Sequence, residues 1–254
     1  MSAIREFSAE AILLAGGGAA LLLQLANPAV GRGVAEHSDF ANRPLDRLEG
    51  TLTYLTVTVY GTPEEARLVA RRVGEAHAPV RSADYDARDP ELQLWVAATL
   101  YDTAVRVHEL AFGPLEVEAA ETLLADYAVI GTALGVPRSL WPADRAAFAA
   151  YWGAAVGRLR VDEPARRVAQ QLLHPVSGPW WLRSLMPTAR VVTAGLLDEP
   201  LREAYGLHHD PRRFARFARF ARGVYPRLPR RWRRAPMRWV LRKFRRLSRA
   251  DPSA

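Results

Sequence analysis

The sequence predicts an all-α protein, with one large domain of roughly ten helices over residues 1–210 and a basic helical extension over residues 211–254. Three observations predict this class. Apolar residues recur at helical spacing along most of the chain. Prolines stand where these runs begin, at the first-turn position that needs no backbone N–H. Strand signals are scarce, and a hydrophobic content of 49% excludes general disorder.

The first strongly apolar segment is AEAILLAGGGAALLLQLA, at residues 9–26. Its length is close to the roughly 20 residues that a helix spanning a bilayer requires. Three glycines lie in its middle, the only basic residue before it is Arg5, and no A-x-A cleavage site follows it. We therefore expect a buried core helix, no signal peptide, and a cytoplasmic protein that can still lie at the periphery of a membrane.

Two helices joined by a turn are predicted between Pro44 and Pro79, and the second proline ends the second helix. The β-branched alternation of LTYLTVTVY at residues 52–60 is also compatible with a strand. We predict a helix there because the leucine spacing continues through it and no second strand is available for pairing. Thr62, with Glu65 three residues later, has the form of a capping box and marks the start of the second helix.

Proline and glycine mark further helix boundaries. Gly113-Pro114 and Gly135 are expected at the ends of two helices. The prolines expected at helix starts are Pro28, Pro44, Pro63, Pro90, Pro142, Pro164, Pro200 and Pro211. No internal repeat or Gly/Ser-rich linker divides the chain before residue 211, so a single domain is predicted there.

Arg47, Thr51 and His77 are the candidate site residues that spacing brings out. Arg47 and Thr51 lie four residues apart, so they share a polar helix face beside an apolar stripe. That stripe consists of Leu45, Leu48, Leu52 and Leu55. His77 falls among apolar positions on the inward side of the next helix, where an unsatisfied polar group costs about 1–3 kcal/mol. Its partner could be a carbonyl, a carboxylate or a metal, and on the residues alone a satisfied core histidine is the favoured interpretation.

The chain contains no cysteine, which excludes disulfides, iron–sulfur clusters, thiolate-ligated haem and covalent c-type haem. A single histidine cannot hold zinc, which needs several protein ligands. Haem accepts a single protein ligand because the porphyrin supplies the equatorial nitrogens. Any haem would therefore be non-covalent b-type haem with a nitrogen ligand, which the residues permit without requiring.

Other catalytic motifs are absent from the sequence. It contains no G-x-S-x-G, H-E-x-x-H or P-loop pattern. No spacing recommends a pair among the 27 carboxylates for acid–base catalysis. His208-His209 is interpreted as part of a solvated loop, and His108 and His174 lie near predicted helix ends, where a protonated imidazole suits the helix dipole.

Five pieces of the chain, taken in their order and spacing, carry a resemblance to a known family. They are residues 11–40, RLEGT at 47–51, VYGTPEEA at 59–66, VGEAHAPVR at 73–81 and ARDPELQLWVAATL at 87–100. Weaker similarity continues at Trp141-Pro142 and at residues 196–207. By these motifs the chain resembles the haem oxygenase family that contains the latex-clearing rubber oxygenase and the fungal oxygenase MpaB.

The resemblance implies roles for individual residues. His77 matches the family's proximal haem ligand, and Arg47 and Thr51 match its Arg-x-x-x-Thr pair on the distal side of the haem. In the rubber oxygenase a lysine directly precedes that threonine, whereas this chain has Gly50, which cannot ligate iron. The resting iron would then be five-coordinate, water-bound or capped by another residue such as His37. The alternative for His37 is a structural polar cap.

The activity implied by the resemblance is an O2-dependent oxidation or cleavage of a C=C bond in a small apolar, isoprenoid-like substrate, with haem b as cofactor. Arg47 and Thr51 would stabilise the negative charge that develops on oxygen in a dry pocket. The leucine-rich first helix would pack the substrate against the haem. The alternative is a non-catalytic helical protein that binds haem or associates with a membrane.

The C-terminal extension carries a large share of the basic charge. Between Pro211 and Ala250 there are 16 Arg or Lys residues and no acidic residue, whereas residues 1–210 contain 19 basic and 26 acidic residues. Aromatic residues are interleaved with these arginines. Such a segment is typical of a helix on an anionic membrane surface, which we favour over nucleic acid as the partner. Packing of the extension on the acidic body is the remaining alternative.

Overall fold

The computed structural model describes residues 2–37, 44–175 and 179–250, and only the backbone of residues 44–47 and 250. These residues form 14 α-helices and two 3₁₀-helices with no strand among them, so the predicted all-α class is confirmed. The number exceeds the expected ten because α1 (Ala3–Phe7), α11 (Glu199–Ala204) and α13 (Arg230–Arg233) are very short. Helices of this length show no recognisable periodicity in a sequence.

The remaining helices follow one another with short connections. Those of the N-terminal half are η1 (Ala11–Gly16), α2 (Gly17–Leu25), α3 (Pro28–His37), α4 (Pro44–Tyr60), α5 (Pro63–His77), α6 (Pro90–Phe112) and α7 (Val117–Thr132). Those of the C-terminal half are α8 (Arg145–Gly157), α9 (Glu163–Leu173), α10 (Trp180–Leu196), α12 (Pro211–Gly223), η2 (Tyr225–Arg227) and α14 (Ala235–Ala250).

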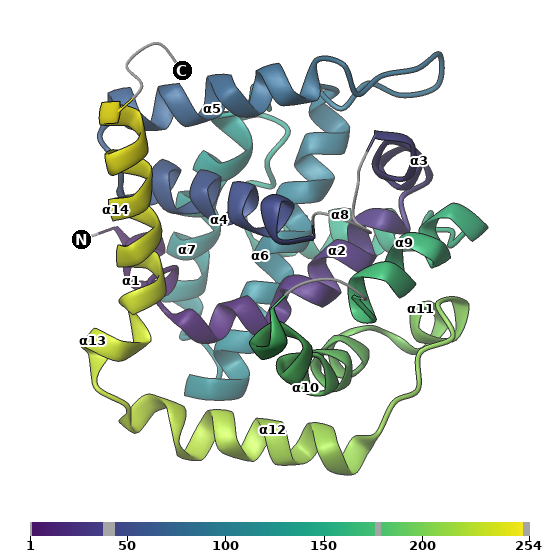
Figure 1. Ribbon diagram of the computed structural model, residues 1–254, viewed down its shortest axis with the longest axis vertical. Helices are drawn as coiled ribbons and strands as arrows, with labels where there is room; N and C mark the ends of the chain where they lie inside the picture. Colours follow the sequence, from purple (N-terminus) through teal and green to yellow (C-terminus); the bar gives the residue numbers. More distant parts are fainter. Residues whose placement is uncertain (1, 38–43, 176–178, 251–254) are drawn as a thin grey trace.

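Helix α6, which has 23 residues, runs through the middle of the molecule (Figure 1). Two clusters of buried residues lie against it. One cluster joins Trp95 and Val107 of α6 to residues of α2, α9, α10 and α12. The other joins Leu94 and Tyr101 of α6 to residues of α1, α4, α5 and α7. Helix α6 therefore separates a part built on the first apolar segment from a part built on the α4–α5 pair.

The predicted pair of helices is present as α4 and α5. Residues 52–60 belong to α4, so the helical interpretation of LTYLTVTVY is confirmed. The capping box also forms: Thr62 N donates to Oε2 of Glu65 at 2.9 Å, and Glu65 N donates to Oγ1 of Thr62 at 3.2 Å. Local hydrogen bonds of this kind depend only on neighbouring residues, which is why the sequence predicts them well.

One predicted helix start is wrong. Pro142 was expected to begin a helix, but α8 begins at Arg145. Asp144 is the residue that caps it, because its Oδ1 accepts a hydrogen bond from Ala147 N at 2.7 Å. An aspartate cap therefore decides this boundary and the proline lies in the preceding loop.

Two of the three consecutive glycines of the first apolar segment allow it to pack closely in the core. A Cβ on Gly16 would lie 3.2 Å from the carbonyl oxygen of Thr103, and a Cβ on Gly18 would overlap Oγ1 of Thr193. A Cβ on Gly17 would meet nothing within 4 Å. Gly16 therefore permits the close approach to α6, and Gly18 permits the close approach to α10.

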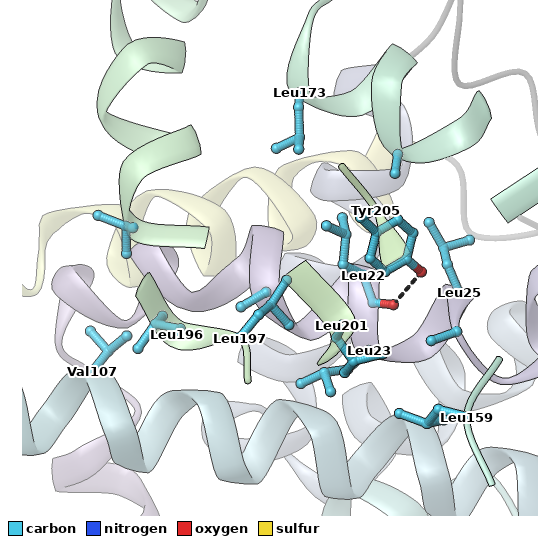
Figure 2. Packing of buried hydrophobic residues seen from close by; sticks show 14 of the residues in the cluster. Leu22, Leu23, Leu25, Val107, Leu159, Leu173, Leu196, Leu197, Leu201 and Tyr205 are labelled. Carbon is cyan, nitrogen blue, oxygen red and sulfur yellow. Dashed lines mark hydrogen bonds between the residues drawn. The ribbon is translucent and has the colours of Figure 1, made fainter. Parts of the chain in front are cut away.

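The leucines of α2 lie in the interior, so the prediction of a buried core helix is confirmed. Leu22 and Leu25 are 0% exposed, and the carbonyl of Leu22 accepts a hydrogen bond from Tyr205 Oη at 2.7 Å (Figure 2). Among the described helices, none is long and apolar enough to cross a membrane alone. The bent pair Ala11–Leu25 and Pro28–His37, at 104°, passes that test by length and composition only.

The basic helices α12 and α14 each pack one face on the body (Figure 1). Phe214 and Phe217 of α12 pack against the cluster beside α6 and α10. A Cβ on Gly195 of α10 would overlap the ring of Phe214, so this contact requires a glycine. Val240 and Phe244 of α14 are buried, and α14 packs against α4. Part of the apolar surface of these helices is therefore used for packing on the body, whereas Phe220, Trp239 and Leu247 are exposed.

A buried ion pair joins the end of the chain to its beginning. Nη1 of Arg233 lies 2.7 Å from Oε2 of Glu10, and the two side chains are 8% and 7% exposed. Tyr225 Oη donates to the same carboxylate at 3.0 Å and accepts from Ile12 N at 3.1 Å. The guanidinium also lies over the ring of Phe112, 5.5 Å from its centroid. These partners compensate for the removal of two charges from water.

The glycine contact predicts a stability difference between two adjacent substitutions. Gly18→Ala should lower the free energy of unfolding by about 1–3 kcal/mol, because the new methyl group overlaps a buried threonine. Gly17→Ala should be neutral or stabilising by up to about 1 kcal/mol, because alanine favours the helix and meets open space. Urea unfolding of both variants measures the difference. Equal destabilisation by the two substitutions would contradict the packing described.

The buried ion pair predicts a second difference. Arg233→Gln should lower the free energy of unfolding by about 3–5 kcal/mol, because Glu10 is left buried without its counter-charge. Arg230→Gln, at an exposed position of the same short helix, should change it by less than about 0.5 kcal/mol. Thermal and urea unfolding of the two variants checks this, and similar values for both would show that the pair does not hold the extension.

Candidate functional site

The α4–α5 pair brings Arg47 and His77 to the same end of a helical hairpin. The two helices lie side by side and run in opposite directions from the turn at Gly61 (Figure 1). Arg47 and His77 lie at similar sequence distances from that turn. A helix rises about 1.5 Å per residue, so the backbone atoms of Arg47 and of His77 each lie roughly 20 Å from the turn. The side chain of Arg47 lies outside the described residues.

His77 is the last residue of α5 and is half-buried. Its Nδ1 atom is shielded from solvent. It continues an apolar stripe that includes the buried Val69 and the partly buried Val73, as the helical spacing predicts. Its carbonyl accepts from Val80 N at 2.9 Å, and the helix ends before Pro79 as expected. The imidazole of His77 therefore lies on the inward face of α5, at the end of the hairpin opposite the turn.

Several described side chains in the first turns of α4 are exposed to solvent. Thr51 is exposed, and Leu48, a member of the predicted apolar stripe, is 47% exposed. A Cβ on Gly50 would meet nothing within 4 Å, and the same holds for Gly74, one turn before His77 on α5. Among the described residues, Gly50 and Thr51 therefore lie on the surface of α4, with the exposed side chain of Leu48 beside them.

His37 lies at the end of α3 in a hydrogen-bonded cluster with Tyr85 and Glu36. Tyr85 Oη donates to Oε2 of Glu36 at 2.6 Å, and the pKa of Tyr85 is raised by this hydrogen bond and by burial. His37 Nε2 lies 3.1 Å from the same phenol oxygen. Because the single phenol proton is given to Glu36, His37 Nε2 acts as the donor. This nitrogen is thus engaged with protein, as expected of a structural cap.

The loop after His77 is fixed to α3 by Tyr85, a residue that sequence reasoning did not single out. Tyr85 is buried, and its ring carbon would lie 3.2 Å from a Cβ on Gly33 of α3. The base of the loop is closed by Ala87 N, which donates to the carbonyl of Val80 at 2.9 Å. The end of α5 is therefore anchored to the end of α3. A lone aromatic residue within the polar stretch RSADYDAR was the available signal.

The donor chemistry at this end of the hairpin is compatible with a b-type haem. His77 carries the kind of nitrogen donor that haem iron accepts. Among the described residues, no group of three or more His, Asp or Glu side chains could hold a metal ion. The expectation that leucines of the first helix pack a substrate is wrong for Leu22 and Leu25, which are buried in the core.

Asp102 of α6 is a buried carboxyl group with a raised pKa. Burial raises its pKa from 3.8 to about 6, although Arg106 opposes the shift with Nε at 2.8 Å from Oδ2. Arg106 also donates to the carbonyl of Leu196 at 3.3 Å and lies 3.7 Å from Asp198. These contacts join α6 to the start of α11 and contain no group of the proposed site.

Comparison with known proteins agrees with the resemblance seen in the sequence. Residues 4–224 match the family described as ER-bound oxygenase mpaB/B'/Rubber oxygenase, catalytic domain. The uncharacterized protein Mb2261 of Mycobacterium bovis is 39% identical over 192 residues, which cover 72% of this chain and 75% of the relative. The uncharacterized protein Rv2237 of Mycobacterium tuberculosis matches with the same identity and coverage. No solved structure matches the chain.

The raised pKa of Asp102 predicts a pH dependence of stability. The folded state favours the protonated carboxyl, so the free energy of unfolding should fall by about 3 kcal/mol as the pH rises through the interval between about 4 and 6. Asp102→Asn should remove this fall, because the amide does not titrate. Urea unfolding at several pH values measures how the free energy of unfolding changes with pH in the wild type and in the variant. Asp84→Asn, at a side chain that is 65% exposed, is the control and should keep the wild-type dependence.

Proposed function

This chain belongs to the family of ER-bound oxygenase mpaB/B' and rubber oxygenase catalytic domains, and on that premise we propose that it is a b-type haem-dependent oxygenase for an apolar substrate. The observation that carries the proposal is the position of His77. It lies at the end of the α4–α5 hairpin to which the first turns of α4 also bring the backbones of Arg47 and Thr51. The family membership supports an oxygenase, and the haem and the substrate class are the proposed steps.

His77 is the residue that would hold the haem. When bound, haem supplies an iron centre that activates dioxygen for oxidation or cleavage of a C=C bond. The role of α5 is to present a nitrogen donor from a helix whose inward face is fixed by Val69 and Val73. The role of Tyr85 is to anchor the loop that follows, so that the last turn of α5 keeps its position.

Arg47 and Thr51 would stabilise the negative charge that develops on dioxygen during the reaction. They are spaced by one helical turn, so a guanidinium and a hydroxyl can address the same space. Negative charge that develops on oxygen during the reaction is stabilised best by a fixed cation and a hydrogen-bond donor in a site that excludes water. An apolar substrate over the exposed side chain of Leu48 would exclude that water. The choice of an isoprenoid-like alkene rests on the family.

A non-catalytic haem-binding protein is the second candidate function, and the exposure of Thr51 favours it. In that case Arg47 and Thr51 would serve only the solubility and capping of α4. The two functions share haem binding through His77 and differ in the consumption of oxygen.

The haem proposal predicts a spectroscopic result. Protein purified with haem should show a Soret band, and His77→Ala should abolish it because the one nitrogen donor is removed. His174→Ala, at an exposed histidine at the end of α9, is the control and should keep the band. Haem binding that is unchanged in His77→Ala would contradict the assignment of the ligand.

The oxygenase proposal predicts a separate kinetic result. Arg47→Ala should keep the Soret band and lower alkene-dependent oxygen consumption on the order of a hundredfold, the usual loss when one charge-stabilising group is removed. Arg71→Ala, at an exposed position of α5, is the control. Mass spectrometry of reactions with candidate isoprenoids identifies carbonyl products. Normal haem binding without oxygen consumption by any of these alkenes would favour the non-catalytic alternative.

A further inference from the structure

Helix α14 presents a basic outward face that the body does not cover. Val240 and Phe244 are buried against the body, so the apolar face of the helix is already used. The opposite side carries one exposed tryptophan and four exposed arginines on successive turns. The outward face of α14 consists of Arg238, Trp239, Arg242, Arg246 and Arg249. Helix α14 lies along one edge of the molecule, which leaves this face accessible (Figure 1).

Two shallow hollows lie along α14 and are lined largely by arginine side chains. One of about 540 Å³ is lined by Arg242, Arg245, Arg246 and Arg249. The other, of about 430 Å³, is lined by Ala235, Arg238, Leu241 and Arg242. The guanidinium groups at the ends of these side chains can bind phosphate oxygens in a bidentate manner. The hollows share Arg242, so they are neighbours along the helix.

Little of the positive charge of the outward face is neutralised by the described residues. Arg249 contributes to the lowered pKa of Glu65, but that carboxylate is paired with Arg245. The carboxylates that meet the last helices are paired with other residues: Glu10 with Arg233, Glu49 with Lys243 and Glu65 with Arg245. Within the described part of the chain, the four arginines of the outward face form no ion pair with an acidic side chain. Their charge is therefore available to an external anion.

Two indole rings accompany these arginines. Trp239 of α14 is 54% exposed, and Trp232 of the preceding helix α13 is 61% exposed. Lys243 Nζ lies 5.2 Å from the ring centroid of Trp239. Tryptophan prefers the boundary between lipid headgroups and acyl chains. A nucleic-acid duplex offers no comparable apolar layer, so the pair of indoles favours lipid as the source of the phosphate.

We propose that the outward face of α14, together with Trp232, docks the protein on a bilayer that contains anionic phospholipids. The arginines bind headgroup phosphates, and the two indoles lie in the interfacial layer. Because Val240 and Phe244 remain packed on the body, the helix adsorbs to the surface and does not insert its apolar face. Binding should therefore be dominated by charge and be sensitive to salt. The inference is independent of haem and of catalysis.

The test is co-sedimentation of the full-length protein with vesicles. Vesicles with about a third phosphatidylglycerol should bind at least about tenfold more protein than pure phosphatidylcholine vesicles, and about 0.5 M NaCl should remove most of the binding. The variant with Arg242→Gln and Arg246→Gln should bind the anionic vesicles at least about tenfold more weakly. Trp232→Ser with Trp239→Ser should also weaken binding, by several-fold.

The matched control removes two exposed arginines elsewhere, by Arg138→Gln and Arg167→Gln, and should bind as the wild type does. Thermal unfolding of each variant confirms that it is folded, and all four changed arginines are exposed. Equal binding to neutral and anionic vesicles, or equal losses in the two double-arginine variants, would overturn the proposal. Binding to duplex DNA without binding to anionic vesicles would overturn it as well and identify nucleic acid as the partner.

Discussion

The buried ion pair between Glu10 and Arg233 is the contact on which the arrangement of the last helices depends. Each charge would cost several kcal/mol to bury alone, so neither side chain can occupy its place without the other. Glu10 lies directly before η1, and Arg233 ends α13. The pair therefore ties the basic extension to the start of the chain. Tyr225, which donates to the same carboxylate, extends this attachment to the end of α12.

The Glu10–Arg233 pair fixes α13, and the following helix α14 lies along α4. Helix α14 makes two ion pairs with the α4–α5 hairpin. Lys243 Nζ lies 2.5 Å from Oε1 of Glu49, and Arg245 Nε lies 2.8 Å from Oε1 of Glu65. The Arg245 guanidinium lowers the pKa of Glu65, which also closes the capping box of α5. Glu49 is two residues from Thr51. The extension thus stabilises both helices that carry the candidate haem residues, and the proposed docking face lies on the other side of the same helix.

The sequence predicted those features of the fold and the site that depend on neighbouring residues. The α4–α5 pair, its capping box and the inward position of His77 all follow from helical periodicity and local hydrogen bonds. Tyr85 and the donor role of His37 Nε2 could not be predicted, because they depend on the loop after α5 meeting the end of α3. The exposure of Leu48 could not be predicted for the same reason. The periodicity of a helix does not show which of its turns pack against another helix.

The sequence by itself determined the helical class, most helix boundaries, the absence of cysteine chemistry and the separation of an acidic body from a basic extension. Composition and short-range spacing are sufficient for these because they involve residues only a few positions apart. Only the tertiary structure decided that Gly18 meets Thr193, that Glu10 pairs with Arg233, and which face of α14 remains exposed. These contacts join residues far apart in the chain, and they depend on how helices cross, which no local pattern records.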